Sequence, residues 1–229
     1  MNSGGDEASR GIDWKHRAGL GGVLMISGVG VLAMLMLVVM ALNRTAPPTF
    51  VPTVRDPRPD PAGIVGPELF TADATVPERW RFFSFARGVL VDDTDSLAWD
   101  LAFRRFQVMA NGGAGFAGSG GIVDLGEVPF DDVLTVPADG YVSNRVRGDT
   151  INTAIQDWYS YSYLSHLLSP KPRVYAIRTA DGRYAKLQFL GYYCPGAQPG
   201  CVTFRYVFQA DGGRKTFDAR ISGRTAAEK

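Results

Sequence analysis

The chain has 229 residues, which is enough for one domain of ordinary size with a substantial core and for further segments outside it. Its 24 Lys and Arg residues nearly balance its 23 Asp and Glu residues, so the formal net charge is +1. This balance gives no reason to expect nucleic acid or an acidic macromolecule as a partner.

The first predicted element is a transmembrane helix over residues 18–42, after a short N-terminal segment of residues 1–17. Ser27 is the one conventionally polar side chain in this run, and no charge interrupts it. At about 1.5 Å per residue the run spans roughly 37 Å, more than the ~30 Å of a hydrocarbon core. It ends in bulky residues rather than at an A-x-A-like cleavage site, so we expect an uncleaved anchor.

The charges on either side of this run predict its orientation. Three basic residues closely precede it, whereas only Arg44 closely follows it. Because cytoplasmic flanks carry the excess of Lys and Arg, residues 1–17 are expected in the cytoplasm. Residues 43–229 are then expected in the periplasm, on a single-pass protein of the bacterial inner membrane.

Small residues are concentrated in the first part of the run. Ala18 and Gly22 have small-xxx-small spacing, and Ser27 and Gly30 follow. Small side chains let helix backbones approach closely, so these positions predict packing against other transmembrane subunits of a larger complex. The alternative is that glycine is simply tolerated in membrane helices.

Residues 43–75 are predicted to form a proline-rich spacer. Seven of the chain's 14 prolines lie between residues 43 and 70. Proline disfavours a helix or a central strand and favours an extended backbone. The segment is therefore expected either to hold the following domain away from the membrane or to lie as a belt on a partner's surface.

A mainly β, antiparallel domain is predicted over residues 76–222, followed by a flexible tail of residues 223–229. Residues 79–91 indicate two short strands joined near Gly88. Four later runs rich in aromatic and β-branched residues predict a meander, because Asp-Gly turns separate the first two runs and the last two. These runs are residues 172–179, 183–193, 201–209 and 215–221.

Two stretches of this domain are less regular. In the first, Trp99, Leu101 and Phe103 alternate with polar residues and are predicted to share one face of a strand. In the second, residues 150–168 are rich in aromatic side chains, and their pattern leaves a short helix and an ordered loop as alternatives.

Both cysteines, Cys194 and Cys201, lie in the stretch CPGAQPGC. Two prolines and two glycines bend the chain between them, and an oxidising compartment would join them. The alternative is a C-x6-C half-site for a metal. A second Cys or His pair is missing, so we predict a structural disulfide and no metal site.

Residues 111–122, NGGAGFAGSGGI, contain the pattern G-x-G-x-x-G at Gly113, Gly115 and Gly118. A dinucleotide loop needs a buried parallel strand before it and a helix after it. The sequence that follows contains glycine, proline and β-branched residues without helical periodicity. We therefore expect a flexible loop and no nucleotide.

Three stretches resemble the HmuY-like haem-binding proteins, a family of envelope proteins with an all-β fold. They are SLAWDLAFRRFQVMANGGAGFAGSGG, VPFDDVLTVPADGY and the long stretch from DWYSYSYLSHLL to FRYVFQADG. Most distinctive are the W-D-x-A-F-x-R strand before N-G-G and the hairpin Y-A-x-R-T-A-D-G-x-Y-A-K-L-Q. The resemblance covers roughly residues 78–218 and implies the family's fold, with haem as the ligand.

The family's haem activity implies two axial ligands, usually His or Met. His166 is the single histidine beyond the predicted anchor, and Met109 is the single methionine there. Both residue types ligate haem iron, so the pair His166 and Met109 is the candidate ligand set. The alternatives are a histidine hydrogen-bonded within an aromatic cluster and a methionine that fills the core.

The aromatic residues Trp158, Tyr159, Tyr161 and Tyr163 predict either core packing or a protein interface. A G-x-S-x-G nucleophile motif is missing from the sequence, and we expect no catalysis. The first functional hypothesis is a non-catalytic accessory subunit without a cofactor. Its periplasmic β domain would pack on a larger membrane complex, such as a respiratory or photosynthetic assembly. The alternative is a tethered haem- or small-ligand-binding module.

Overall fold

The computed structural model describes residues 28–40, 46–94, 96–147 and 149–216. The chain forms two compact units, residues 1–45 and 46–229. In the first unit, residues 28–40 form a helix whose side chains are exposed. Among the described residues, no helix is long and apolar enough to cross a membrane.

The predicted anchor over residues 18–42 lies only partly in the described part of the chain. Ala18, Gly22 and Ser27 lie outside it. Gly30 lies in the helix, and an added Cβ there would have open space around it. The anchor and its packing face therefore stay predictions.

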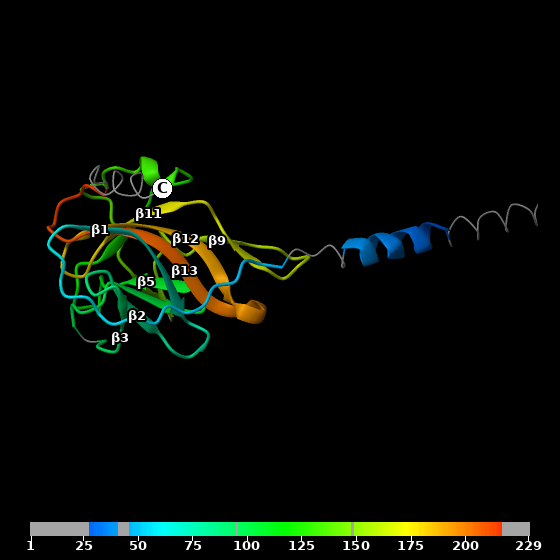
Figure 1. The fold of residues 1–229 in the computed structure, drawn as a ribbon, viewed down its shortest axis with the longest axis horizontal. Coiled ribbons are helices and arrows are strands. Elements are labelled where there is room, and N and C mark those ends of the chain that lie inside the picture. The colour runs from blue at the N-terminus through cyan, green and yellow to red at the C-terminus, as the bar shows by residue number, and fades with distance from the viewer. Residues whose placement is uncertain (1–27, 41–45, 95, 148, 217–229) are drawn as a thin grey trace, which may run out of the picture. The chain divides into compact units, whose positions relative to one another are not determined.

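The second unit is built on a five-stranded antiparallel sheet in the order β1-β13-β12-β11-β6 (Figure 1). Its strands are β1 (Ile64–Asp73), β6 (Gly121–Asp124), β11 (Val174–Arg178), β12 (Tyr184–Cys194) and β13 (Gln198–Gln209). The consecutive strands β11, β12 and β13 pair antiparallel as a meander, with register shifts between β12 and β13 near Gly191. The first three runs of the predicted meander are confirmed, whereas most of the fourth, residues 215–221, lies outside the described residues.

A second, four-stranded antiparallel sheet has the order β3-β2-β4-β5. Its strands are β2 (Arg81–Ser84), β3 (Val89–Val91), β4 (Leu101–Arg104) and β5 (Gln107–Ala110). The β2–β3 hairpin turns where the sequence predicted it, and Gly88 there has a φ of 68°, a conformation that favours glycine.

The main core lies between the two sheets and is largely aromatic. Phe70 of β1 and Phe83 of β2 have ring centroids 4.6 Å apart, and Phe103 of β4 stacks on Phe204 of β13 at 5.3 Å. All four side chains are almost completely buried. Such ring pairs stabilise the fold by about 1 kcal/mol each beyond the apolar area they bury, so they fix how the sheets face one another.

Two short hairpins extend from the sheets. They are formed by β7 (Arg145–Arg147) with β8 (Asp149–Ile151), and by β9 (Tyr159–Tyr161) with β10 (Leu168–Pro170). Two 3-10 turns, η1 (Phe130–Asp132) and η2 (Pro195–Ala197), complete the described elements. Residues 150–168 thus contain turns, the short strands β8 and β9 and the start of β10, so the short-helix alternative is wrong.

The predicted spacer over residues 43–75 is wrong in its second half. Residues 64–73 form β1, which pairs with β13 at the edge of the large sheet. An edge strand tolerates proline, and Pro67 lies where the register shifts between Val65 and Glu68. The β domain therefore begins before residue 76.

Residues 46–60, called the strap below, lie along their own domain. The backbone N–H of Phe50 donates to the carbonyl of Tyr193 at 2.8 Å, and the ring of Phe50 packs directly over Gly191. Further along, Arg58 donates to the carbonyl of Ala86 at 2.8 Å. The strap therefore lies on this chain's own domain, whereas the prediction was either a spacer or a belt on a partner's surface.

The predicted common face of Trp99, Leu101 and Phe103 is also wrong. Leu101 and Phe103 belong to the core between the sheets, whereas Trp99 precedes β4 and packs in a separate cluster. Asp100 between them is buried, and its carboxylate accepts N–H groups from two loops. Because the Asp100 carboxylate is buried and hydrogen-bonded to these loops, the alternation of side chains between two faces begins only at Leu101.

Candidate functional site

A cavity of about 520 Å³ lies beside the β9–β10 hairpin. Its size is in the usual range for a small-molecule site. Its walls come from the hairpin, from the β4–β5 turn and from the β12–β13 connection, which are far apart in the sequence. The lining is mainly aromatic, with Phe106 and four tyrosines, Tyr159, Tyr161, Tyr192 and Tyr193.

Unusual backbone geometry is concentrated around this cavity. Arg105, His166 and Ala197 have φ values of 54°, 57° and 58°. They are the non-glycine residues with positive φ in the described part of the chain, and all three line the cavity. Each such residue costs about 1 kcal/mol or more, and strain of this kind is concentrated at functional sites.

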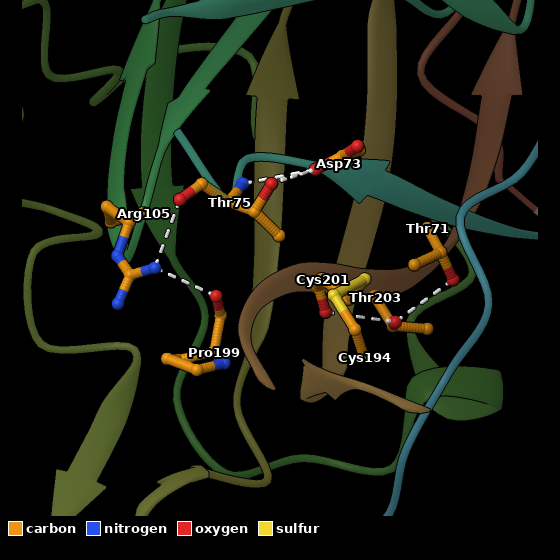
Figure 2. The surroundings of a disulfide bond; sticks show 8 residues. All are labelled: Thr71, Asp73, Thr75, Arg105, Cys194, Pro199, Cys201 and Thr203. Atoms are coloured by element: carbon orange, nitrogen blue, oxygen red, sulfur yellow. Dashed lines mark hydrogen bonds between the residues drawn. A yellow bond between two sulfur atoms is a disulfide. The ribbon is translucent and has the colours of Figure 1, made fainter. Parts of the chain in front are cut away.

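Long-range hydrogen bonds hold Arg105 in this conformation. Its guanidinium donates to the carbonyl of Thr75 at 3.1 Å and to that of Pro199 at 2.9 Å (Figure 2). Pro199 itself lines the cavity. Arg105 therefore fastens the β4–β5 turn to the β12–β13 connection and leaves a cation at the cavity wall.

The hairpin contributes a directly bonded pair of polar side chains. The hydroxyl of Tyr161 lies 2.8 Å from Nδ1 of His166. The backbone N–H of His166 donates to the carbonyl of Ser162 at 2.8 Å, which closes the turn between the two residues. The cavity thus has an imidazole and a phenol at one wall, in a setting otherwise made of aromatic rings.

Met109 does not meet His166 in this cavity. It lies on β5, almost completely buried, in a cluster with Trp99 and Ala102. It is absent from the cavity lining, so the candidate ligand pair of His166 and Met109 is not brought together. Met109 fills the core, as the alternative held.

The four aromatic residues of the predicted interface separate into two groups. Trp158 is 0% exposed, its ring packs against the tilted ring of Phe189 with centroids 4.2 Å apart, and its indole N–H donates to the Phe106 carbonyl at 2.8 Å. Tyr159 is half-buried, whereas Tyr161 and Tyr163 are 47% and 85% exposed. Trp158 is therefore a core residue, and only the outer tyrosines are open to a partner.

The predicted disulfide is confirmed between Cys194 and Cys201 (Figure 2). It joins the end of β12 to β13, so the alternative of a metal half-site is wrong. The loop that it closes carries Ala197 and Pro199, both at the cavity wall. A structural bond thus also limits the movement of one wall of the site.

The glycine-rich stretch connects β5 to β6 without a helix. Gly118 lies against the carbonyl of Asn111 and the backbone of Ala180, where a Cβ would overlap both. Gly113 and Gly118 allow the loop to pack closely on neighbouring backbone, whereas Gly115 meets open space. The helix N-terminus that a pyrophosphate needs is missing from this stretch, as predicted.

Comparison with family models matches residues 77–206 to the family described as HmuY protein. The chain belongs to the HmuY family. Comparison with curated proteins finds no match. The matched residues include the four-stranded sheet, most of the large sheet without β1, and the cavity beside the β9–β10 hairpin.

Solved structures support the HmuY fold. An apo HmuY analogue from Tannerella forsythia is 20% identical, with a TM-score of 0.52 over 62% of this chain and 95% of that one. A putative HmuY-like heme-binding protein from Bacteroides vulgatus is 18% identical, with a TM-score of 0.50 over 63% and 91%. Apo PinO from Porphyromonas gingivitis is 15% identical, with a TM-score of 0.50 over 64% and 97%. At these identities the likeness shows the fold alone.

Several site residues of this HmuY protein were missed from the sequence. The sequence pattern predicts no turn at Arg105 and Phe106, which connect β4 to β5. For Tyr192 and Tyr193 it predicts only their place in a strand of the meander. The available signal was the pair of arginines at positions 104 and 105, which interrupts the alternation at the turn.

Proposed function

We propose that this chain is a non-catalytic haem-binding module and that the cavity beside the β9–β10 hairpin is its site. The observation that carries the proposal is the convergence of three strained residues, Arg105, His166 and Ala197, on one aromatic-walled cavity. Membership of the HmuY family supports haem as the ligand, because the similar B. vulgatus structure is described as that of a putative HmuY-like heme-binding protein.

The residues of the cavity fit a haem. Phe106, Tyr192 and Leu168 offer apolar surface for a flat macrocycle. The Arg105 guanidinium matches the negative charge of propionate groups. The His166 and Tyr161 pair offers nitrogen and oxygen donors of the types that hold haem iron. A bound haem would supply the iron, and Tyr161 or His166 would hold it.

The proposal includes the predicted location. Residues 18–42 would tether the domain to the bacterial inner membrane, with the HmuY domain in the periplasm. A second candidate is the accessory-subunit hypothesis, which is favoured by Tyr163 and Leu164. Both are 85% exposed on the hairpin, where a partner could cover them. Purification from mildly solubilised membranes would test it, since stoichiometric co-purification with a larger complex is its required result.

The haem proposal is tested by titrating the detergent-solubilised full chain with hemin and following the Soret band. Phe106→Lys places an ammonium at the partly exposed cavity wall, so hemin affinity should fall about tenfold or more. Leu97→Lys is the matched control, because Leu97 is similarly exposed and lines a different pocket. A wild-type chain without a Soret shift, or equal losses in both variants, would contradict the proposal.

A further inference from the structure

The tip of the β9–β10 hairpin exposes apolar side chains. Tyr163 and Leu164 are both 85% exposed, and Tyr161 beside them is 47% exposed. Residues 158–170 contain no Asp, Glu, Lys or Arg, although charged residues make up 21% of the chain. An exposed apolar patch of this kind is typical of a surface that meets a protein or a membrane.

We propose that this tip, residues 161–166, rests on the lipid surface of the membrane that holds the proposed anchor. The proposal rests on the proposed location of the chain and adds a second point of contact with the bilayer. Tyrosine is enriched at membrane interfaces because its ring is apolar and its hydroxyl is polar. Leu164 adds an apolar side chain next to the exposed ring of Tyr163.

The start of the strap lies at the base of this hairpin (Figure 1). The backbone N–H of Phe50 donates to the carbonyl of Tyr193 at 2.8 Å, and the Tyr193 hydroxyl accepts the backbone N–H of Leu168 at 2.8 Å. Pro48 and Leu168 also line the same small cavity. The chain therefore enters the β domain at the end that carries the exposed tip.

The length of chain before the strap limits how far this end can lie from the membrane. A transmembrane helix over residues 18–42 leaves only residues 43–45 before Ala46. At about 3.6 Å per extended residue, the chain from residue 42 to Ala46 covers about 14 Å or less. The headgroup region on each side of a bilayer is about 5–8 Å thick, so the hairpin end of the domain lies within reach of it.

The backbone of the tip suits a partly dehydrated surface. Ser162 N–H donates to the Leu167 carbonyl at 2.9 Å, and His166 N–H donates to the Ser162 carbonyl at 2.8 Å. Ser165 N–H donates to the Ser162 hydroxyl at 3.3 Å. Backbone groups without partners are costly in lipid, so a turn that satisfies these groups internally can rest in the headgroup layer.

Contact of the tip with lipid also orients the proposed haem site. Tyr161, His166 and Leu167 belong to the hairpin and line the cavity. A hairpin held at the bilayer surface therefore places the cavity beside the lipid. A protein that covered the same tip would need no lipid, so vesicles without any other protein separate the two occupants.

Fluorescence of a labelled chain in such vesicles tests the proposal. Leu164→Cys in the full chain gives one reactive thiol, since Cys194 and Cys201 are joined and buried. Nitrobenzoxadiazole on this thiol should emit at shorter wavelength in vesicles of phosphatidylethanolamine and phosphatidylglycerol, and lipids spin-labelled near the headgroup should quench it. Leu97→Cys is the matched control and should show neither change. Leu97 is 52% exposed and lies with Asp60 beside the other end of the strap.

Flotation of the vesicles on a density gradient separates this proposal from the proposed location. If the chain floats with the lipid but the label at position 164 behaves like the label at position 97, the tip does not contact lipid and the location still stands. If the chain does not float, the proposed location fails and the contact fails with it. The hemin titration is independent of both results, because it depends on the cavity alone.

Discussion

Replacement of the buried Lys186 should change how the stability of the domain depends on pH. Lys186 lies on β12 and is 1% exposed. Its ammonium donates to the carbonyls of Phe130 at 2.7 Å and Val133 at 2.9 Å, so it holds the η1 turn against the large sheet. Burial lowers the pKa of Lys186 from 10.5 to about 8, with Arg205 adding to the decrease and Asp131 opposing it.

The size of the effect follows from this pKa. Between pH 8 and pH 10.5 the unfolded chain still binds a proton at Lys186, whereas the folded chain has released it. The free energy of unfolding therefore rises with pH over this interval, by about 3 kcal/mol from this one group, since each pH unit contributes about 1.4 kcal/mol. Below pH 8 the folded chain also binds the proton, so this contribution is lost.

The assay is urea unfolding of the full chain at a series of pH values, followed by near-ultraviolet circular dichroism. Lys186→Met removes the titrating group but keeps a side chain of similar length. Its stability at neutral pH will differ because two carbonyls lose their donor, at a cost of about 1–3 kcal/mol. The test is the pH dependence of the difference between the two chains. A difference that is constant from pH 8 to pH 10.5 would refute the reasoning.

Two further predictions concern the chain around the site. Substitution of both Cys194 and Cys201 by serine should lower the free energy of unfolding by roughly 2.5 kcal/mol, because the bond closes a loop with a sequence separation of only 7; an unchanged urea midpoint would contradict this. Gly191→Ala places a methyl group in the ring of Phe50, so it should release the strap and speed tryptic cleavage there. Gly63→Ala, which meets open space, is the control, and equal cleavage rates would show that the ring does not hold the strap.

The site was only partly predictable because its parts come from distant segments. His166 was identified as a candidate from its residue type and from the family resemblance. Its hydrogen bond to Tyr161 depends on a turn that the sequence pattern left open between a helix and a loop. Met109 is also of a residue type that ligates haem iron, but strand β5 places its side chain in a buried cluster. Residue type alone cannot decide which face of a strand meets a cavity.

The sequence by itself determined the β11–β12–β13 meander, the β2–β3 hairpin and the Cys194–Cys201 bond, because these features depend on residues close together in the chain. Each depends on neighbours in the chain: Asp-Gly turns, alternating apolar residues, and two cysteines separated by prolines and glycines. Only the tertiary structure decided the edge strand β1 and the cavity. Strand β1, which contains Pro67, is stable because β13 pairs with it, and the strained turn at Arg105 is held by carbonyls from two other segments. Such long-range contacts leave no periodic signal in the sequence, because the partners meet only when the sheets pack.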